Sequence, residues 1–349
     1  MRRSILAAAA AVIVLGPGLE AQTAISARGA DIRIGGRLHQ QFYASSVAGE
    51  SSTFFTRRAR VILDGTFTDL VSGRLQADVA GTAKLVDAYV RLNFSPTFRV
   101  TFGQFKRPFD LFELVSSTDL SLIERTGKVG GYDECTGVGS ICSYSRLTEA
   151  LRYADRDSGI KVDGSSGDVS YQFAVTNGTK LGTDDENDGK SVSGRVSIMA
   201  AENVQVSANA AVKDYVDPSD ETAHAIAWGG DVQVGDWRDG LLVQAAVVSG
   251  DNWLALDAAD NPGAFLTGQV AVSFFFPVDN DRVSGVEPIG RISVADPDDS
   301  VDEDGGLLLT PGFMIYFSGK NKLGFNYDYY APSTGDAVSG FRFSTFLYF

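Results

Sequence analysis

Arginine side chains recur in one part of the sequence at spacings that suggest anion chemistry. One residue separates Arg58 from Arg60, and Arg91 and Arg99 follow further along. The guanidinium group offers a planar fork of N–H donors that matches phosphate and other oxyanions, and it stays charged at every relevant pH. A row of such groups would raise the local anion concentration and could pass an anion from site to site, provided that each site binds weakly.

Other reactive side chains are scarce. The 349 residues include two histidines and two cysteines, which leaves little for a zinc cluster, a haem or a Cys-His nucleophile pair. We therefore expect no metal and no cofactor. The rival enzyme is a barrel phospholipase, which would resemble a Ser-His-Asn device with a His-x-Ser motif. Neither His39, followed by two glutamines, nor His224, followed by alanine and isoleucine, fits that motif, so we expect no enzyme.

Charge is distributed unevenly along the chain. With 30 Lys and Arg against 44 Asp and Glu, the net charge is −14, which is opposite to the basic footprint of a nucleic-acid-binding protein. Five segments hold 19 of these acids and no Lys or Arg, so the rest of the chain carries +5. These segments are 184–188, 214–221, 251–260, 279–281 and 296–304. We interpret them as solvated loops, with divalent-cation binding as the alternative.

The first residues predict export. A pair of arginines precedes the apolar run 5–15, and a small-residue cleavage site follows. This is the layout of a signal peptide over residues 1–21, with cleavage possible as late as after Ala24. The run is too short to span about 30 Å of hydrocarbon. The mature domain, residues 25–349, would then cross the inner membrane of a bacterium-like cell.

Nearly all of the mature chain alternates with a period of two. In 31–43, 169–176 and 204–213, apolar residues interleave with polar ones, which is the signature of outer-membrane barrel strands. The pattern predicts an all-β fold, a transmembrane 16-stranded antiparallel β-barrel, and an even strand number suits closure. The expected strands are 31–43, 54–67, 70–80, 83–94, 98–105, 156–164, 168–176, 190–200, 203–213, 224–234, 240–249, 264–276, 284–295, 306–318, 321–330 and 340–349.

Short and long connections alternate, as expected when short turns are periplasmic and long loops lie outside. The third outer loop, 106–155, is far longer than its neighbours, and loops of that length are usually functional. Apolar residues such as Leu111 and Phe112 would be unfavourable on a solvated tip. We therefore expect the loop to fold inward and narrow the pore. The alternative is a cap over the rim.

Charged residues of the strands are expected to face the lumen, because arginine facing lipid at the midplane costs about 2–4 kcal/mol. The polar face also includes Arg37 and Lys161, and acids that could pair with the bases, among them Asp87 and Asp163. The predicted anion contacts are Arg58, Arg60, Arg74, Arg91, Arg99, Lys106, Arg107 and Arg125. The alternative is that many of these cations pair with lumenal carboxylates or belong to a solvated wall.

Cys135 and Cys142 lie within the long loop, seven residues apart. An exported protein meets an oxidising compartment, so we expect a disulfide between them that stiffens the loop. A free, reactive pair is the alternative.

Several motifs resemble one family. Arg57-Arg-Ala-Arg60, Asp87-Ala-Tyr-Val-Arg91 and Gly103-Gln-Phe-Lys-Arg-Pro-Phe109 are similar to the phosphate-selective porin O/P family, and 57–126 carries the specific part. The stretch from Glu287 to Asp298 is similar more weakly. The resemblance implies homotrimers of sixteen-stranded porins with an inward third outer loop. The chain also ends on a strand with a terminal Phe349, as Gram-negative outer-membrane proteins do.

These observations together predict an outer-membrane porin for passive diffusion of small anions. Phosphate or other oxyanions are the expected solutes, outer-membrane lipid and two further copies of the chain are the expected partners, and nucleic acid is not expected. A general, non-selective diffusion porin is the first alternative. A structural outer-membrane barrel protein is the second, and it would show closed channels in bilayers.

Overall fold

The structure is a computed structural model, and it describes residues 23–27, 29–183, 185 and 187–349. The predicted signal peptide, residues 1–21, lies outside these residues. Cleavage after Ala24 would fall within the first described strand, β1 (Thr23–Ala27). This strand, which the alternation did not predict, pairs with the first residues of β2.

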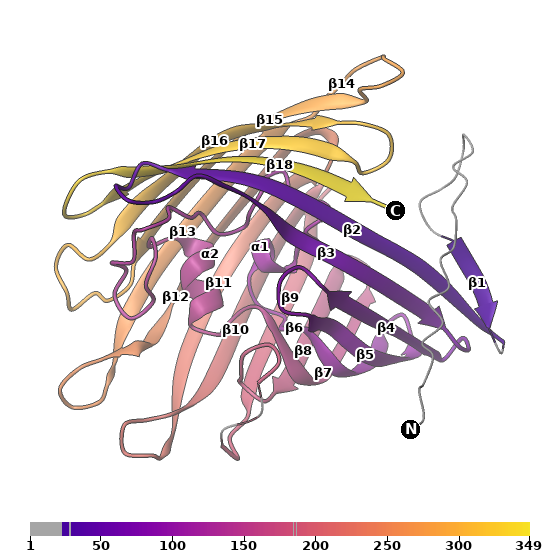
Figure 1. The fold of residues 1–349 in the computed structure, drawn as a ribbon. Coiled ribbons are helices and arrows are strands. Elements are labelled where there is room, and N and C mark those ends of the chain that lie inside the picture. The colour runs from indigo at the N-terminus through magenta and orange to yellow at the C-terminus, as the bar shows by residue number, and fades with distance from the viewer. Residues whose placement is uncertain (1–22, 28, 184, 186) are drawn as a thin grey trace, which may run out of the picture.

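Sixteen antiparallel strands form one closed barrel, which confirms the predicted fold class (Figure 1). The sheet also contains β1 and the two-residue β14, which continues β13. Strand β18 pairs with β2 and β9 pairs with β10, so every barrel strand has a neighbour on both sides. The barrel strands are β2 (Ala30–Ser45), β3 (Thr53–Thr66), β4 (Val71–Asp78), β5 (Lys84–Ser95), β6 (Phe98–Lys106), β7 (Arg156–Ser166), β8 (Val169–Thr176), β9 (Ser191–Ala201), β10 (Val204–Val216), β11 (Thr222–Asp236), β12 (Asp239–Leu256), β13 (Pro262–Phe274, continued by β14, Phe276–Pro277), β15 (Gly285–Asp296), β16 (Gly306–Tyr316), β17 (Lys322–Pro332) and β18 (Val338–Tyr348).

Side chains alternate between the two surfaces of the barrel. In β15, Arg291 and Ser293 are buried, whereas Ile292 and Val294 are at least half exposed. Polar residues thus face the interior and apolar residues face outward. This is the reverse of a soluble barrel, and it suits an outer surface that contacts acyl chains.

One irregularity of the sheet changes which side chains face inward. The register between β2 and β3 shifts after His39, and Arg57 is the extra residue on β3. Such a β-bulge interrupts the period of two. The side chains of Arg57 and Arg58, although consecutive, therefore reach the same carboxylate, that of Glu124.

The long connection between β6 and β7, residues 107–155, contains two short helices, α1 (Leu111–Leu114) and α2 (Tyr144–Ala150). No helix among the described residues is long and apolar enough to cross a membrane. Leu147 and Leu151 are fully buried in an apolar cluster with side chains from β10 to β13 and β15 to β17. Burial of this apolar surface holds the connection against that part of the wall.

Hydrogen bonds fix the middle of this connection to β15 and β17. The backbone N–H of Ile123 donates to Asn326 Oδ1 at 2.7 Å, and Ser121 Oγ donates to Glu287 Oε1 at 2.7 Å. Lys322 Nζ donates to a backbone carbonyl of the connection at 3.1 Å. The connection therefore leaves β6 and is anchored on strands that are far from β6 in the sheet.

Candidate functional site

Two cavities lie between the long connection and the wall that runs from β18 through β2 to β8. The loop-side cavity has a volume of about 390 Å³ and lies near the long connections. The turn-side cavity has a volume of about 320 Å³ and lies nearer the short turns. Strand β2 runs past both, because Arg37 lines the turn-side cavity and Gln41 lines the loop-side cavity.

Basic side chains dominate the turn-side cavity. Its basic lining residues are Arg37, Arg74, Arg91, Lys106, Arg156 and Lys161. One carboxylate, that of Asp87, also lines it, and Tyr89 and Phe105 add aromatic surface. Of the eight predicted anion contacts, this cavity brings together Arg74, Arg91 and Lys106.

Most of these cations are paired with carboxylates. Arg74 Nε lies 2.6 Å from Asp64 Oδ1, and Arg156 Nε lies 2.7 Å from Asp87 Oδ1. Asp163 accepts from Arg99 at 2.7 Å and forms a longer ion pair with Arg91, whose Nη2 lies 3.7 Å from Asp163 Oδ1. The charged side chains that line the cavity, together with those that ion pairs connect to them, comprise eight basic and five acidic groups. Their net charge is +3, so the cavity keeps an excess of positive charge.

Arg37 and Lys161 are the unpaired cations of the cavity: within the described residues, neither has a carboxylate oxygen within 4.0 Å. Arg37 donates to Ser117 Oγ of the long connection. The Nζ of Lys161 lies 5.1 Å from the ring centroid of Phe105. Both side chains face the interior, as the alternation predicts, but no local pattern indicates that these two lack acidic partners.

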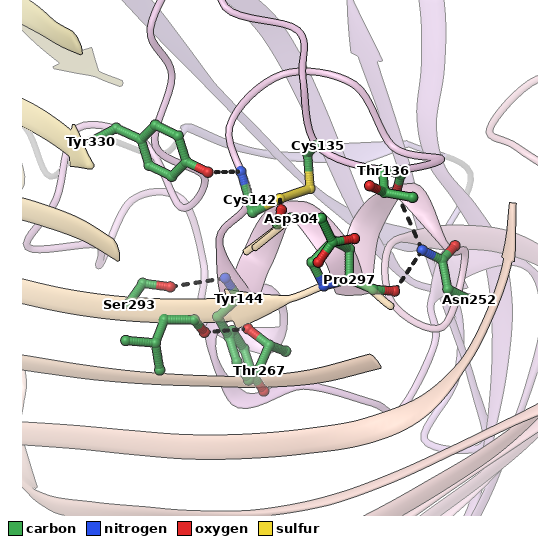
Figure 2. Close-up of a disulfide and its surroundings, with 11 residues drawn as sticks. Cys135, Thr136, Cys142, Tyr144, Asn252, Thr267, Ser293, Pro297, Asp304 and Tyr330 are labelled. Atoms are coloured by element: carbon green, nitrogen blue, oxygen red, sulfur yellow. Dashed lines mark hydrogen bonds between the residues drawn. A yellow bond between two sulfur atoms is a disulfide. The ribbon is translucent and has the colours of Figure 1, made fainter. Parts of the chain in front are cut away.

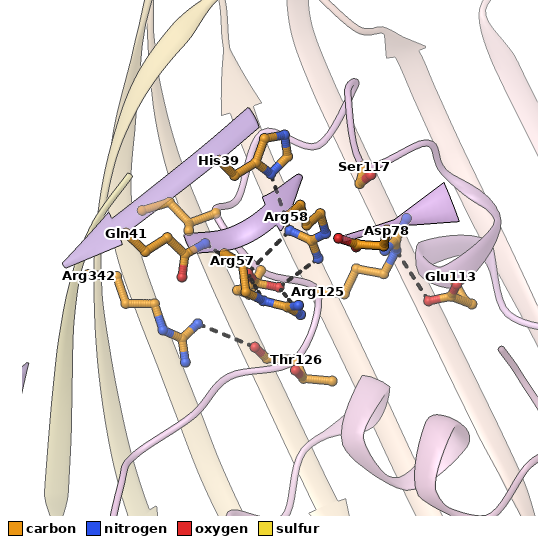
Figure 3. A network of polar contacts seen from close by, with 12 residues as sticks. His39, Gln41, Arg57, Arg58, Asp78, Glu113, Ser117, Arg125, Thr126 and Arg342 are labelled. Atoms are coloured by element: carbon orange, nitrogen blue, oxygen red, sulfur yellow. Dashed lines mark hydrogen bonds and ion pairs between the residues drawn. The ribbon is translucent and has the colours of Figure 1, made fainter. Parts of the chain in front are cut away.

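Glu124 of the long connection lines the loop-side cavity and contacts Gln41, Arg57 and Arg58, which are labelled in Figure 3. Arg57 Nε lies 2.8 Å from Glu124 Oε1, Arg58 Nη2 lies 3.0 Å from Oε2, and Gln41 Nε2 donates to Oε1 at 2.9 Å. Burial opposes ionisation of Glu124, but the two arginines outweigh it and hold its pKa well below the usual range. Arg57 was not among the predicted contacts, because strict alternation would place it outside.

Lys106 and Arg125 donate hydrogen bonds to backbone carbonyls of α1 and of the residue that follows it. Lys106 Nζ donates to the backbone carbonyls of Glu113, Leu114 and Val115, which uses its three donors. Arg125 Nε donates to the carbonyl of Phe112 at 2.8 Å, and its Nη2 donates to a second carbonyl of the same turn. Both therefore hold the long connection in place, in addition to contributing charge.

Arg107, another predicted anion contact, is absent from the linings of the two cavities described here. It is buried, its Nη2 lies 2.7 Å from Asp157 Oδ2, and the same nitrogen donates to the carbonyl of Thr179 at 2.9 Å. Arg60 is likewise paired, with Asp78 at 2.7 Å. The predicted contacts Arg58, Arg60, Arg99 and Arg125 are also absent from the cavity linings described here. Ion pairs connect Arg58, Arg99 and Arg125 with residues that line a cavity, whereas, among the described residues, the pair of Arg60 and Asp78 has no such connection.

The family model of phosphate-selective porin O and P matches residues 32–252, which is more than half of the chain. The chain belongs to this porin family. Residues 57–126, on which the resemblance mainly rested, lie inside the match, whereas the stretch from Glu287 to Asp298 lies beyond it. The family and the barrel fold are those of outer-membrane channel proteins.

Solved porin structures have the same fold. The anion-selective porin from Comamonas acidovorans is 13% identical, with 92% of this chain and 100% of that chain covered and a TM-score of 0.66. The outer-membrane channel DcaP of Acinetobacter baumannii is 13% identical, with 92% and 99% covered and a TM-score of 0.63. The trimer form of OmpT of Vibrio cholerae is 14% identical, with 92% and 100% covered and a TM-score of 0.57. Among curated proteins, none matches the sequence significantly.

In this porin, Cys135 and Cys142 form a disulfide whose Cα atoms are 5.1 Å apart (Figure 2). The backbone N–H of Cys142 donates to Tyr330 Oη at 3.2 Å, and that of Tyr144 donates to Ser293 Oγ at 2.8 Å. Closing so short a loop stabilises it by about 2–3 kcal/mol through the entropy of the open chain. The disulfide thus stiffens the part of the connection that contacts β15 and β17.

Asp110 links α1 to α2 and makes this contact sensitive to pH. Its carboxylate accepts from the N–H of Phe112 at 2.9 Å and from Thr148 Oγ1 at 2.8 Å. Burial raises the pKa of Asp110 from 3.8 to about 6 despite these donors. The folded contact therefore favours the protonated acid, so its stabilisation is full below pH 3.8 and is lost as the pH rises through about 6.

We expect the free energy of opening at α2 to be about 2 kcal/mol lower at pH 7 than at pH 4, since one pKa unit corresponds to about 1.4 kcal/mol. Hydrogen exchange of the α2 amides, corrected for the intrinsic pH dependence, measures this difference. In Asp110→Asn the amide does not ionise, so the dependence should flatten. An Asp110→Asn variant with the wild-type pH dependence would contradict the assignment to this carboxylate.

Proposed function

We propose that this porin admits small anions by passive diffusion, with phosphate and other oxyanions as the preferred solutes. The observation that carries the proposal is the turn-side cavity, which six basic side chains and one carboxylate line. An anion entering it would exchange hydration for N–H donors that are already in place. The net charge of +3 around the cavity would raise the local anion concentration and disfavour cations.

The route we propose passes through both cavities, because the long connection occupies the other part of the interior. Its apolar face packs on β10 to β17, and buried arginines of that wall are paired with carboxylates, such as Arg195 with Asp231 and Arg291 with Asp328. The inward connection would act as the constriction, with Glu124 lining the loop-side cavity and paired with Arg58. This proposal includes the predicted role of residues 106–155.

Weak binding is part of the proposed mechanism. Five carboxylates compete with the solute for the cations of the turn-side cavity, which keeps each site from trapping an anion. The same carboxylates favour the general diffusion porin as the second candidate function, because they neutralise most of the positive charge. The two candidate functions therefore differ in ion selectivity, which measurements of the ionic current through the porin resolve.

The zero-current potential of the purified porin in a planar bilayer tests the proposal. Under a KCl gradient we expect the sign that corresponds to chloride preference, and we expect added phosphate to reduce the chloride current. A potential of the opposite sign would refute anion passage. Anion preference without any reduction by phosphate would leave the general porin as the function.

We also propose that the porin assembles as a homotrimer whose apolar outer surface contacts outer-membrane lipid. The trimer form of OmpT of Vibrio cholerae supports the first part. The exposed apolar residues that alternate along each strand, such as Ile292 and Val294, support the second.

A further inference from the structure

Three cations from three different elements surround the carboxylate of Glu113 in α1. Its oxygens lie 3.6 Å from Lys106 Nζ, 3.3 Å from Arg125 Nε and 3.8 Å from Arg156 Nη1. The side chain of Glu113 is buried, and two of the three cations line the turn-side cavity. This carboxylate is therefore a counter-ion at the edge of the cavity.

The three cations do not depend on Glu113 for their positions. Lys106 is held by the carbonyls at the end of α1, and Arg125 is held by carbonyls of the same turn. Arg156 is held by Asp87, with Nε and Oδ1 2.7 Å apart. Removal of the charge on Glu113 would therefore leave the cations in place and less neutralised.

Chemically, a carboxylate resembles the group that the cavity would receive. It is an oxyanion with two acceptor oxygens, and guanidinium and ammonium groups bind it as they bind phosphate. Burial opposes ionisation of Glu113, but Arg125, Lys106 and Arg156 together hold its pKa below the usual range. The three cations thus favour the ionised form of Glu113.

We propose that Glu113 is a built-in competitor of the permeating anion and sets the affinity of the turn-side cavity. Its carboxylate occupies the position, among three cations, that an oxyanion group of the solute would otherwise take. The solute is thereby bound weakly enough to be released. This inference rests on the proposed function, because it concerns the same cavity.

The variant Glu113→Gln keeps the size of the side chain and removes its charge. We expect the phosphate concentration that halves the chloride current to fall about fivefold or more, because a unit charge about 4 Å from the bound anion contributes at least this factor in a water-like dielectric. Asp119→Asn is the matched control. Asp119 lies in the same connection and pairs with Lys320 at 2.8 Å, outside both cavities as described here, so this variant should leave the half-blocking concentration unchanged.

Each outcome decides between the two proposals. Cation preference in the wild type would refute the proposed function and this inference with it. Anion preference with an unchanged half-blocking concentration in Glu113→Gln would overturn this inference alone, as would an equal shift in Asp119→Asn. If Glu113→Gln fails to assemble, Glu113→Asp gives the answer: withdrawing the carboxylate by one methylene should shift the value in the same direction by a smaller factor, and no shift would overturn the proposal.

Discussion

Replacing Arg37 and Lys161 together with glutamine is expected to weaken phosphate block of the chloride current by about thirtyfold or more. A unit charge at 4 Å contributes about 1 kcal/mol even in a water-like dielectric, and more in a cavity of lower dielectric. Two such charges correspond to about 2 kcal/mol, and 1.4 kcal/mol is a factor of ten in affinity. The half-blocking phosphate concentration in a planar bilayer measures the effect.

These two cations were chosen because their removal leaves no carboxylate without a partner. Neither forms an ion pair with the described acids, whereas loss of Arg99 would leave Asp163 without its arginine donor inside the barrel. A loss of affinity in the double variant can therefore be attributed to the missing charges and not to a rearranged wall.

The matched control is Lys84→Gln combined with Arg282→Gln. Both residues are exposed, both are outside the described linings of the two cavities, and the change in net charge is the same. We expect the control to retain the wild-type phosphate block. A double variant of Arg37 and Lys161 that is blocked as readily as the wild type would contradict the assignment of these cations to the anion path.

Replacing Leu147 with aspartate is expected to raise the single-channel conductance severalfold and to reduce anion preference. Leu147 is fully buried in α2 within the apolar cluster on β10 to β17. A carboxylate there would be buried without a cation in the cluster, which costs several kcal/mol. Release of α2 from the wall avoids this cost, and the long connection would then vacate the interior.

The control is Leu147→Met, which keeps the volume and the apolar character and costs less than about 1.5 kcal/mol. Conductance and anion preference in this variant should match the wild type. Electrophoresis shows whether the aspartate variant still forms the barrel, because an unheated, folded barrel migrates differently from the heat-denatured chain. A folded Leu147→Asp barrel with wild-type conductance would show that the connection does not narrow the pore.

The strands and their faces could be predicted because a period of two is a local property. Each of the sixteen expected segments overlaps one barrel strand, and residues such as Arg91, Arg99 and Asp163 lie on the interior face as the alternation requires. The surrounding lipid makes the alternation a reliable guide to which side chains face inward, because an arginine on the lipid-facing side would cost several kcal/mol. The short strand β1 was missed, since five residues next to the expected cleavage site carry little periodic signal.

Which charges pair, and which stay free to meet a solute, was decided by the tertiary structure. The bulge at Arg57 turns one more arginine inward. Asp163 forms ion pairs with two arginines, Arg91 and Arg99, only because β5, β6 and β7 lie in this register. Lys106, predicted as an anion contact, is held by carbonyls of a helix that follows it in the chain. Such pairings depend on where residues far apart in the sequence meet once the sheet closes, and a local alternation contains no information about that.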